Sequence, residues 1–249
     1  MEGGALLQSP GSTPAADHPQ QGEILEEGRS EAPANGRFTG VPWENGSMSA
    51  PDENLWLANL RANPDHSQNF AQRWRNLAAE GKDIFGEART IDAMAERGSR
   101  ILDAGCGTGR IGGWLSEQGH QVVGIDLDAH LIDVAREDYP LAQWQVGNLA
   151  SFTVDDGAGH LREFDLIVSA GNVVTFLSEA ERLPALQKMR EHLAADGRLV
   201  IGFGAGRGYA FEEFTADAVR AGLAVQQRYS TWTLREPGED FLVAVLGRA

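Results

Sequence analysis

The stretch ILDAGCGTGR, residues 101–110, decides the fold class of this chain. Its first residues are apolar apart from Asp103, and glycines follow at positions 105, 107 and 109. Glycine tolerates positive φ and lets a ligand approach the backbone closely. A helix that starts near Gly109 directs free N–H groups back at the loop. This order of strand, glycine loop and helix predicts a site for a nucleotide-like ligand.

The spacing within the loop narrows the class of ligand. A P-loop needs Gly-Lys-Ser/Thr, whereas Gly109 is followed here by Arg110 and Ile111, so the sequence disfavours a nucleoside triphosphate. A dinucleotide fold uses glycines spaced G-x-G-x-x-G, but this loop reads G-x-G-x-G, with Asp103 two residues before the first glycine. A carboxylate at that point repels a pyrophosphate and suits a ligand that carries an ammonium and a sulfonium group.

The segment Asp103–Arg110 therefore resembles the first motif of the class I S-adenosylmethionine-dependent methyltransferases. The resemblance covers residues 99–249 and implies S-adenosylmethionine as the cofactor and methyl transfer as the activity. It implies that Asp103 and the loop line the methionyl end of the cofactor and that Asp126 holds the ribose hydroxyls. The implied cofactor-binding residues are Asp103, Ala104, Gly105, Gly107, Asp126, Leu127, Asn148, Leu149, Ala170 and Gly171.

Asp126 and Asn148 show how specific the resemblance to this family is. Asp126 lies 21 residues after Gly105 (126 − 105 = 21), a spacing that NAD enzymes share, so it does not separate the two classes. Asn148 stands where the family usually has aspartate. An asparagine oxygen can accept from the adenine amino group and its NH2 can donate to a ring nitrogen, so we expect cofactor binding to survive the change.

Apolar runs after Gly98 alternate with helical patterns in the way that predicts a parallel sheet. The predicted strands are 100–104, 121–126, 141–146, 164–170 and 198–204, followed by a closely spaced pair at 223–234 and 240–247. Two strands joined so closely must be antiparallel. The prediction is an α/β, Rossmann-like, doubly wound seven-stranded sheet, mostly parallel with a C-terminal antiparallel hairpin, plus N-terminal lid helices. Predicted helices occupy 109–118, 129–138, Ser178 to the Asp196-Gly197 stop, and 212–221.

The chain before the glycine loop falls into two parts. Residues 1–50 are rich in Gly, Pro, Ser, Ala, Gln and Glu and are predicted to be disordered. Residues 51–97 are predicted to form a helical lid and 98–249 the methyltransferase domain. In the lid, Asn63 and Pro64 read as a helix cap, and an apolar stripe of Phe70, Trp74 and Leu77 follows at helical spacing. A second short helix is predicted from Ile84 to Met94.

Composition favours a small-molecule acceptor. The formal net charge is -15, and such a surface repels phosphate backbones, so nucleic acid is not a predicted partner. No apolar run is long enough to span a membrane, and we expect neither a membrane partner nor a metal site. Cys106 is the only cysteine, which with the absence of a secretory signal favours a cytoplasmic location. The sequence does not predict an oligomeric state.

Candidate residues for the acceptor lie in three places. Asn172, after the fourth predicted strand, is the candidate catalytic residue and could orient a donor, but no side chain stands out as a general base. The candidate acceptor-binding residues are Trp74, Arg207 and Tyr209. Arg207 lies in the glycine-rich run GFGAGRGY at 202–209, and it reads either as a solvated loop residue or as a contact to a substrate anion.

Two other functions stay open at this point. Asp126 also fits an NAD(P)-dependent oxidoreductase, although Asp103 does not. The lack of a general base leaves room for a non-catalytic S-adenosylmethionine-binding protein that acts as a sensor or regulatory subunit.

Overall fold

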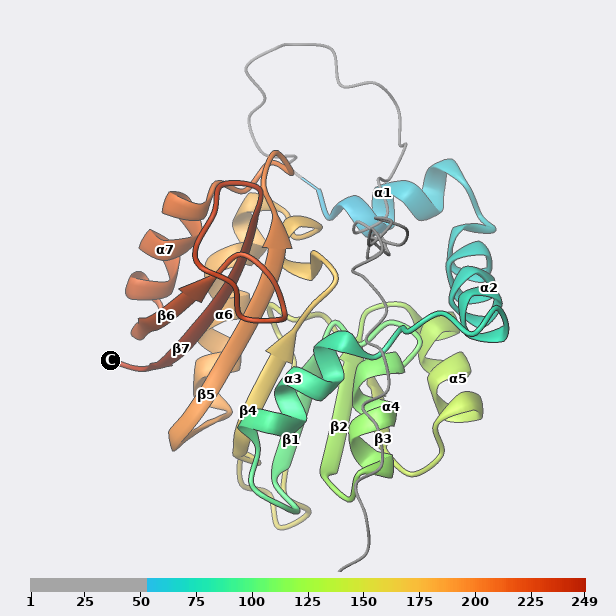
Figure 1. The fold of residues 1–249 in the computed structure, drawn as a ribbon, viewed down its shortest axis with the longest axis horizontal. Helices are drawn as coiled ribbons and strands as arrows, with labels where there is room; N and C mark the ends of the chain where they lie inside the picture. Colours follow the sequence, from blue (N-terminus) through green and yellow to red (C-terminus); the bar gives the residue numbers. More distant parts are fainter. Residues whose placement is uncertain (1–52) are drawn as a thin grey trace, which may run out of the picture. The chain divides into compact units, whose positions relative to one another are not determined.

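The computed structural model describes residues 53–249, so the segment 1–50 that we predicted to be disordered lies outside the described residues. The strands run Arg100–Ala104 (β1), Gln121–Asp126 (β2), Gln143–Val146 (β3), Phe164–Ser169 (β4), Leu193–Gly204 (β5), Leu223–Tyr229 (β6) and Phe241–Arg248 (β7). They form one seven-stranded sheet in the order β3-β2-β1-β4-β5-β7-β6 (Figure 1). The first five strands pair in parallel and β7 is antiparallel to both of its neighbours. The predicted fold class is confirmed.

The helices are Leu55–Ala62 (α1), His66–Ala79 (α2), Gly86–Met94 (α3), Arg110–Glu117 (α4), Ala129–Asp138 (α5), Glu179–Glu191 (α6) and Phe211–Arg220 (α7), with a short 3-10 turn at Val173–Thr175 (η1). Apolar side chains of α6 and α7 join one core cluster with the sheet, whereas those of α3 and α4 join another. In β5, Leu199 and Ile201 belong to the first cluster and Val200 to the second, as the alternation of a strand requires. Helices therefore cover both faces, and the carboxyl ends of β1, β2, β4 and β5 meet at one edge.

Residues 53–97 hold three helices where we predicted two. Helix α1 was missed because its eight residues are followed closely by the Asn63-Pro64 pair, which we interpreted as the cap of the next helix. Asn63 instead ends α1, and Asp65 precedes the first residue of α2. The N-cap of α1 is Asn54, whose side chain accepts from the backbone N–H of Trp56.

Three predicted boundaries around β5 and β6 were wrong. The helix from Ser178 ends at Glu191 instead of continuing to Asp196, and β5 begins at Leu193 instead of at 198. Leu193 is fully buried and pairs with Phe164 across an irregularity in the ladder, so strand pairing overrides the local helical pattern. Strand β6 stops at Tyr229 rather than at 234, and the next residues form a turn in which Leu234 has a positive φ of 59°.

None of the helices within residues 53–249 is long and apolar enough to cross a membrane. Across the same residues, no group of three or more His, Cys, Asp or Glu side chains is placed to hold a metal ion.

Candidate functional site

The glycine loop joins β1 to α4 and is tied to the end of β2. The backbone N–H groups of Gly105 and Cys106 both donate to the carbonyl of Ile125, at 2.8 and 3.0 Å. Gly105 has a φ of 81°, and a Cβ atom there would lie 2.4 Å from Cγ1 of Val173, which follows β4. The loop therefore needs glycine both for its backbone conformation and because Val173 packs against it.

Asp126, the last residue of β2, links two loops through its carboxylate. Its Oδ2 accepts from the N–H of Gly107 at 2.9 Å, and its Oδ1 accepts from the N–H of Asp128 at 2.9 Å. Burial raises the pKa of Asp126 to about 6, against the opposing effect of these backbone bonds. A carboxylate has about four acceptor sites, so two remain for a ligand such as a ribose diol.

Asp103 lies beneath the glycine loop. Its side chain is 1% exposed, and its Oδ2 accepts from the N–H of Gly112 in α4 at 2.8 Å. Burial raises the pKa of Asp103 to about 7, although the bond from Gly112 and the charge of Arg110 act in the other direction. The resemblance implied that this carboxylate lines the methionyl end, whereas the structure directs one of its oxygens at the first turn of α4. Ala104 beside it is fully buried in the core.

The burial of Asp103 makes stability depend on pH. Its pKa is about 7 in the folded protein against an ordinary 3.8, so its contribution to stability is complete below the ordinary value and is lost as the pH rises through about 7. We therefore expect Asp103→Asn to reduce the difference in melting temperature between pH 5 and pH 8, measured by differential scanning calorimetry without ligand. The matched control is Asp133→Asn, since that side chain is 73% exposed. If the melting temperature of Asp103→Asn depended on pH as strongly as that of the parent, Asp103 would not be the group responsible.

Asn148 follows β3, and its amide is bound to the protein itself. Its Oδ1 accepts from the N–H of Ala150 at 2.8 Å, and its Nδ2 donates to Oε1 of Glu181 at 2.8 Å. The other oxygen of Glu181 accepts from Asn54 at 3.0 Å and from the N–H of Ser178 at 2.9 Å. Glu181 thus joins the starts of α1 and α6 to the loop after β3, and Asn148 is the residue of that loop that it binds, a role that the position of Asn148 in the sequence did not predict.

The two leucines of the predicted adenine site differ in placement. Leu149 is 4% exposed and belongs to the large core cluster. Leu127 is half-buried and packs against the buried cluster that holds Trp56 of α1 and Ala71 of α2. Leu127 therefore lies beside the hydrophobic cluster of α1, α2 and α5, whereas Leu149 lies in the core, and the adenine contact of both stays a prediction.

The loop after β4 provides the open part of the site. Gly171 is exposed, and no heavy atom lies within 4 Å of the position that a Cβ would take. Ala170 before it is 7% exposed. Asn172 has a positive φ of 68°, and its Oδ1 accepts from the N–H of Gly204 at 2.8 Å. The candidate catalytic residue thus joins the ends of β4 and β5 and positions both loops.

Helices α1 and α2 are attached to the site through Asp128, the N-cap of α5. Oδ2 of Asp128 accepts from Nε1 of Trp56 at 2.8 Å and also from the hydroxyl of Ser67. The ring of Phe70 approaches Gly107 so closely that a Cβ there would lie 3.4 Å from Cε1 of the phenyl ring. The helices that we predicted as a lid therefore contact the glycine loop directly. Trp56 and Asp128 were not among the predicted site residues.

Trp74 is half-buried, and its ring packs against a charged side chain of the glycine motif. The guanidinium of Arg110 lies 4.3 Å from the centre of the Trp74 ring, within range of a cation–π interaction. Arg110 also donates to both carboxylate oxygens of Glu87 in α3, at 2.9 and 3.1 Å. Because this ring covers Arg110, Trp74 helps to hold α2 to α4, and its contact with an acceptor stays a prediction. In the sequence, the arginine directly after the last glycine of the motif is the residue from which this contact with Trp74 and Glu87 could have been predicted.

Tyr209 is a residue of the core. It is 2% exposed, its hydroxyl donates to Asp217 at 2.8 Å, and its ring contacts those of Phe203 and Phe214. The sequence pattern placed it beside the substrate because it follows the glycine run, but packing between β5 and α7 turns it inward. Arg207, two residues earlier, is half-buried beside Gly204, with its Nε 3.3 Å from the position that a Cβ of Gly204 would take.

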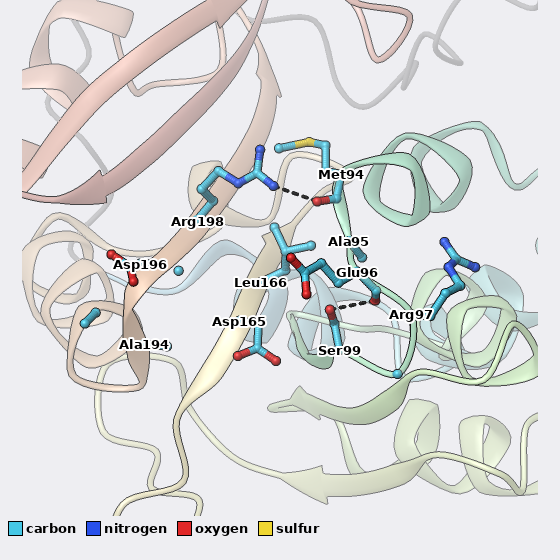
Figure 2. Close-up of a pocket in the computed structure, with 13 residues that line it drawn as sticks. Met94, Ala95, Glu96, Arg97, Ser99, Asp165, Leu166, Ala194, Asp196 and Arg198 are labelled. Atoms are coloured by element: carbon cyan, nitrogen blue, oxygen red, sulfur yellow. Dashed lines mark hydrogen bonds between the residues drawn. The ribbon is translucent and has the colours of Figure 1, made fainter.

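A separate hollow of about 490 Å³ lies at the other end of the strands. It is lined by residues before β1, at the start of β4 and in the first half of β5 (Figure 2). Two of its lining side chains bond to other lining residues: Arg198 donates to the carbonyl of Met94 and Ser99 to the carbonyl of Glu96. Open α/β sheets bind ligands at the carboxyl ends of their strands, so this hollow is not the cofactor site.

The protein has an α/β fold with a glycine loop of the kind that binds nucleotide-like ligands. Comparison with known proteins identifies its family. Residues 101–197 match a family model described as a methyltransferase domain. The chain is similar to the crystal structure of a TehB-like SAM-dependent methyltransferase from Corynebacterium glutamicum, with 56% identity and a TM-score of 0.71. That match covers 75% of this chain and 100% of the other. The chain belongs to the class I S-adenosylmethionine-dependent methyltransferases.

Curated relatives match over a shorter stretch. Magnesium-protoporphyrin O-methyltransferase from Rhodobacter capsulatus is 35% identical over 106 residues, which are 41% of this chain and 45% of that protein. Ubiquinone biosynthesis O-methyltransferase from Klebsiella pneumoniae is 28% identical over 147 residues, 55% of this chain and 58% of that protein. The chain spans about half the length of these curated relatives.

Proposed function

We propose that this protein is an enzyme that transfers the methyl group of S-adenosylmethionine to a small-molecule acceptor. The observation that carries the proposal is the meeting of three features at one edge of the sheet. These are the glycine loop after β1, the carboxylate of Asp126 at the end of β2 and the open loop at Gly171 after β4. Two of the similar proteins are named as O-methyltransferases of protoporphyrin and of ubiquinone biosynthesis, which supports a small acceptor.

The residues present fit the cofactor of this family. Asp126 has spare acceptor sites for a pair of hydroxyls, and Leu127 beside it offers an apolar edge for a base. The space next to Gly171 suits the reacting end of the cofactor, because β4 lies on the side of β1 away from β2. We infer that the adenosine lies towards β2 and β3 and that the acceptor lies over β4 and β5.

Methyl transfer from this cofactor requires little covalent chemistry from the protein. The cofactor supplies an electrophilic methyl group on a sulfonium. The protein orients the two reactants, which supplies roughly 7–11 kcal/mol of the barrier in favourable intramolecular reactions. Asn172 holds the ends of β4 and β5 in one arrangement and so fixes the floor on which the acceptor lies. A general base is required only where the attacking atom carries a proton that must leave.

The lid helices would complete the site by excluding water. Phe70 lies against the glycine loop, and Trp56 and Ser67 hold the lid to Asp128 at the start of α5. Exclusion of water strengthens electrostatic interactions within a site and protects the sulfonium while the acceptor is bound. Residues 53–97 therefore act with the methyltransferase domain as one functional unit in this proposal.

A ligand-binding test separates this function from the two alternatives. We expect S-adenosylmethionine to raise the melting temperature of the full chain, and NADH and ATP to leave it unchanged, because the loop lacks the dinucleotide spacing and the P-loop lysine. A larger shift with NADH would favour an oxidoreductase. Formation of S-adenosylhomocysteine with a metabolite extract, followed by mass spectrometry, distinguishes an enzyme from a non-catalytic binding protein. Methyl label that accumulates in tRNA or cell protein instead would refute the small-molecule acceptor.

A further inference from the structure

Arg207 lies in the loop after β5, on the acceptor side of the proposed site. It is half-buried at the carboxyl end of β5, and its guanidinium forms no ion pair or hydrogen bond with any residue in 53–249. The two buried arginines within residues 53–249 are each paired with a carboxylate: Arg110 with Glu87 and Arg182 with Glu213. Five N–H donors are thus available at Arg207 in a chain with a surplus of acidic groups.

The guanidinium is placed where the acceptor must lie. Its Nε is 3.3 Å, and Oδ1 of Asn172 is 3.6 Å, from the position that a Cβ of Gly204 would occupy. The side chain therefore folds back over the end of β5 and lies next to the loop that follows β4. Glycine at 204 leaves room for this, since a larger side chain would displace the guanidinium. The glycine loop and Asp126 occupy β1 and β2, so Arg207 lies on the side of the sheet opposite the adenosine.

The loop that carries Arg207 is fixed on both sides. The N–H of Ala205 donates to the carbonyl of Asp240 at 2.9 Å, which ties the loop to the segment before β7. Three residues later, Arg182 donates to the carbonyl of Gly208 at 2.5 Å. Arg182 is 2% exposed and lies 4.1 Å from the centre of the Tyr209 ring, so this anchor is itself held by the core. The unpaired guanidinium is therefore displayed from a preorganised loop.

We propose that Arg207 binds an oxyanion of the methyl acceptor, so that the acceptor class is a small organic acid with a carboxylate or phosphate group. The planar guanidinium matches either group through two parallel hydrogen bonds. The proposal rests on the proposed function, because it names the acceptor of that same site. The surface of an acidic protein repels anions. A local unpaired cation offsets this repulsion at the site and orients the bound anion.

Direct binding tests the anion site without turnover. The full chain, saturated with S-adenosylhomocysteine, is titrated by calorimetry with benzoate, with inorganic phosphate and with neutral benzamide. We expect at least one of the anions to bind more tightly than benzamide and to lose at least tenfold in affinity in Arg207→Gln. The control Arg228→Gln alters an exposed arginine on β6 and should leave binding unchanged. Equal anion binding by Arg207→Gln and the parent, or no binding of either anion at millimolar concentration, would overturn the inference. The two anions separate a carboxylate from a phosphate site.

Turnover separates this inference from the proposed function. A metabolite extract is divided on an anion-exchange resin, and each fraction is incubated with methyl-labelled S-adenosylmethionine and the full chain. We expect labelled product from the retained, anionic fraction, at least tenfold less of it with Arg207→Gln, and affinity for S-adenosylmethionine within twofold of the parent. Label that arises from the unretained fraction equally in parent and variant would refute the anionic acceptor and leave the methyltransferase intact. Failure of the parent to bind S-adenosylmethionine would refute the proposed function itself.

Discussion

Replacement of Gly109 by alanine is expected to lower the free energy of unfolding by about 2–5 kcal/mol. This is the sum of the cost of placing alanine in a left-handed backbone conformation and the cost of overpacking. Gly109 precedes α4 with a φ of 76°, and its Cβ would lie 2.7 Å from the Trp144 ring and 2.9 Å from Cβ of Ala135. Both neighbours are buried, so neither can move without opening the contact between α5 and β3. Urea denaturation followed by circular dichroism measures the change.

The matched control for this variant is Gly119→Ala. Gly119 has a φ of 91°, but no heavy atom lies within 4 Å of its Cβ position. It should therefore lose only the backbone part, about 1–2 kcal/mol. Equal losses at Gly109 and Gly119 would show that the contact with Trp144 does not constrain the loop.

Replacement of Asp126 by alanine is expected to weaken S-adenosylmethionine binding by about 1.5–3 kcal/mol, roughly 10- to 150-fold, the value of hydrogen bonds to a charged group. The change also removes the acceptor for the N–H groups of Gly107 and Asp128, so the loops after β1 and β2 lose their common anchor. Isothermal titration calorimetry measures the affinity.

Two further variants decide the cause of that loss. Asp126→Asn keeps an oxygen and the shape of the side chain, so it should retain more of the affinity than alanine does. Asp133→Ala removes an exposed carboxylate from the outer surface of α5 and should bind like the parent. Affinity of Asp126→Ala within twofold of the parent would show that the end of β2 does not hold the cofactor.

Local patterns in the sequence were sufficient to predict the sheet and the part of the site that lies at the ends of its strands. The strand that ends at Ala104 and the one that ends at Asp126 are short apolar runs with a polar residue or glycine at the carboxyl end, and a parallel sheet brings such ends to one edge. The hairpin of β6 and β7 followed from the short turn between them. These features depend on periodicity and glycine spacing, which a single sequence records.

The partners of polar side chains were decided by the tertiary structure alone. Asn148 and Glu181 are 33 residues apart in the chain, and Trp56 and Asp128 are 72 apart, yet each pair is joined by a hydrogen bond. Tyr209 follows a glycine run that predicts a substrate contact, but the space between β5 and α7 buries its ring and turns its hydroxyl to Asp217. The sequence by itself determined the order of the parallel strands and the C-terminal hairpin, and its glycine motif indicated the family that the comparisons then identified. Packing over long separations decided which polar groups find partners within residues 53–249 and which, such as the guanidinium of Arg207, do not. Hydrogen-bond partners are set by distance in space and not by spacing along the chain.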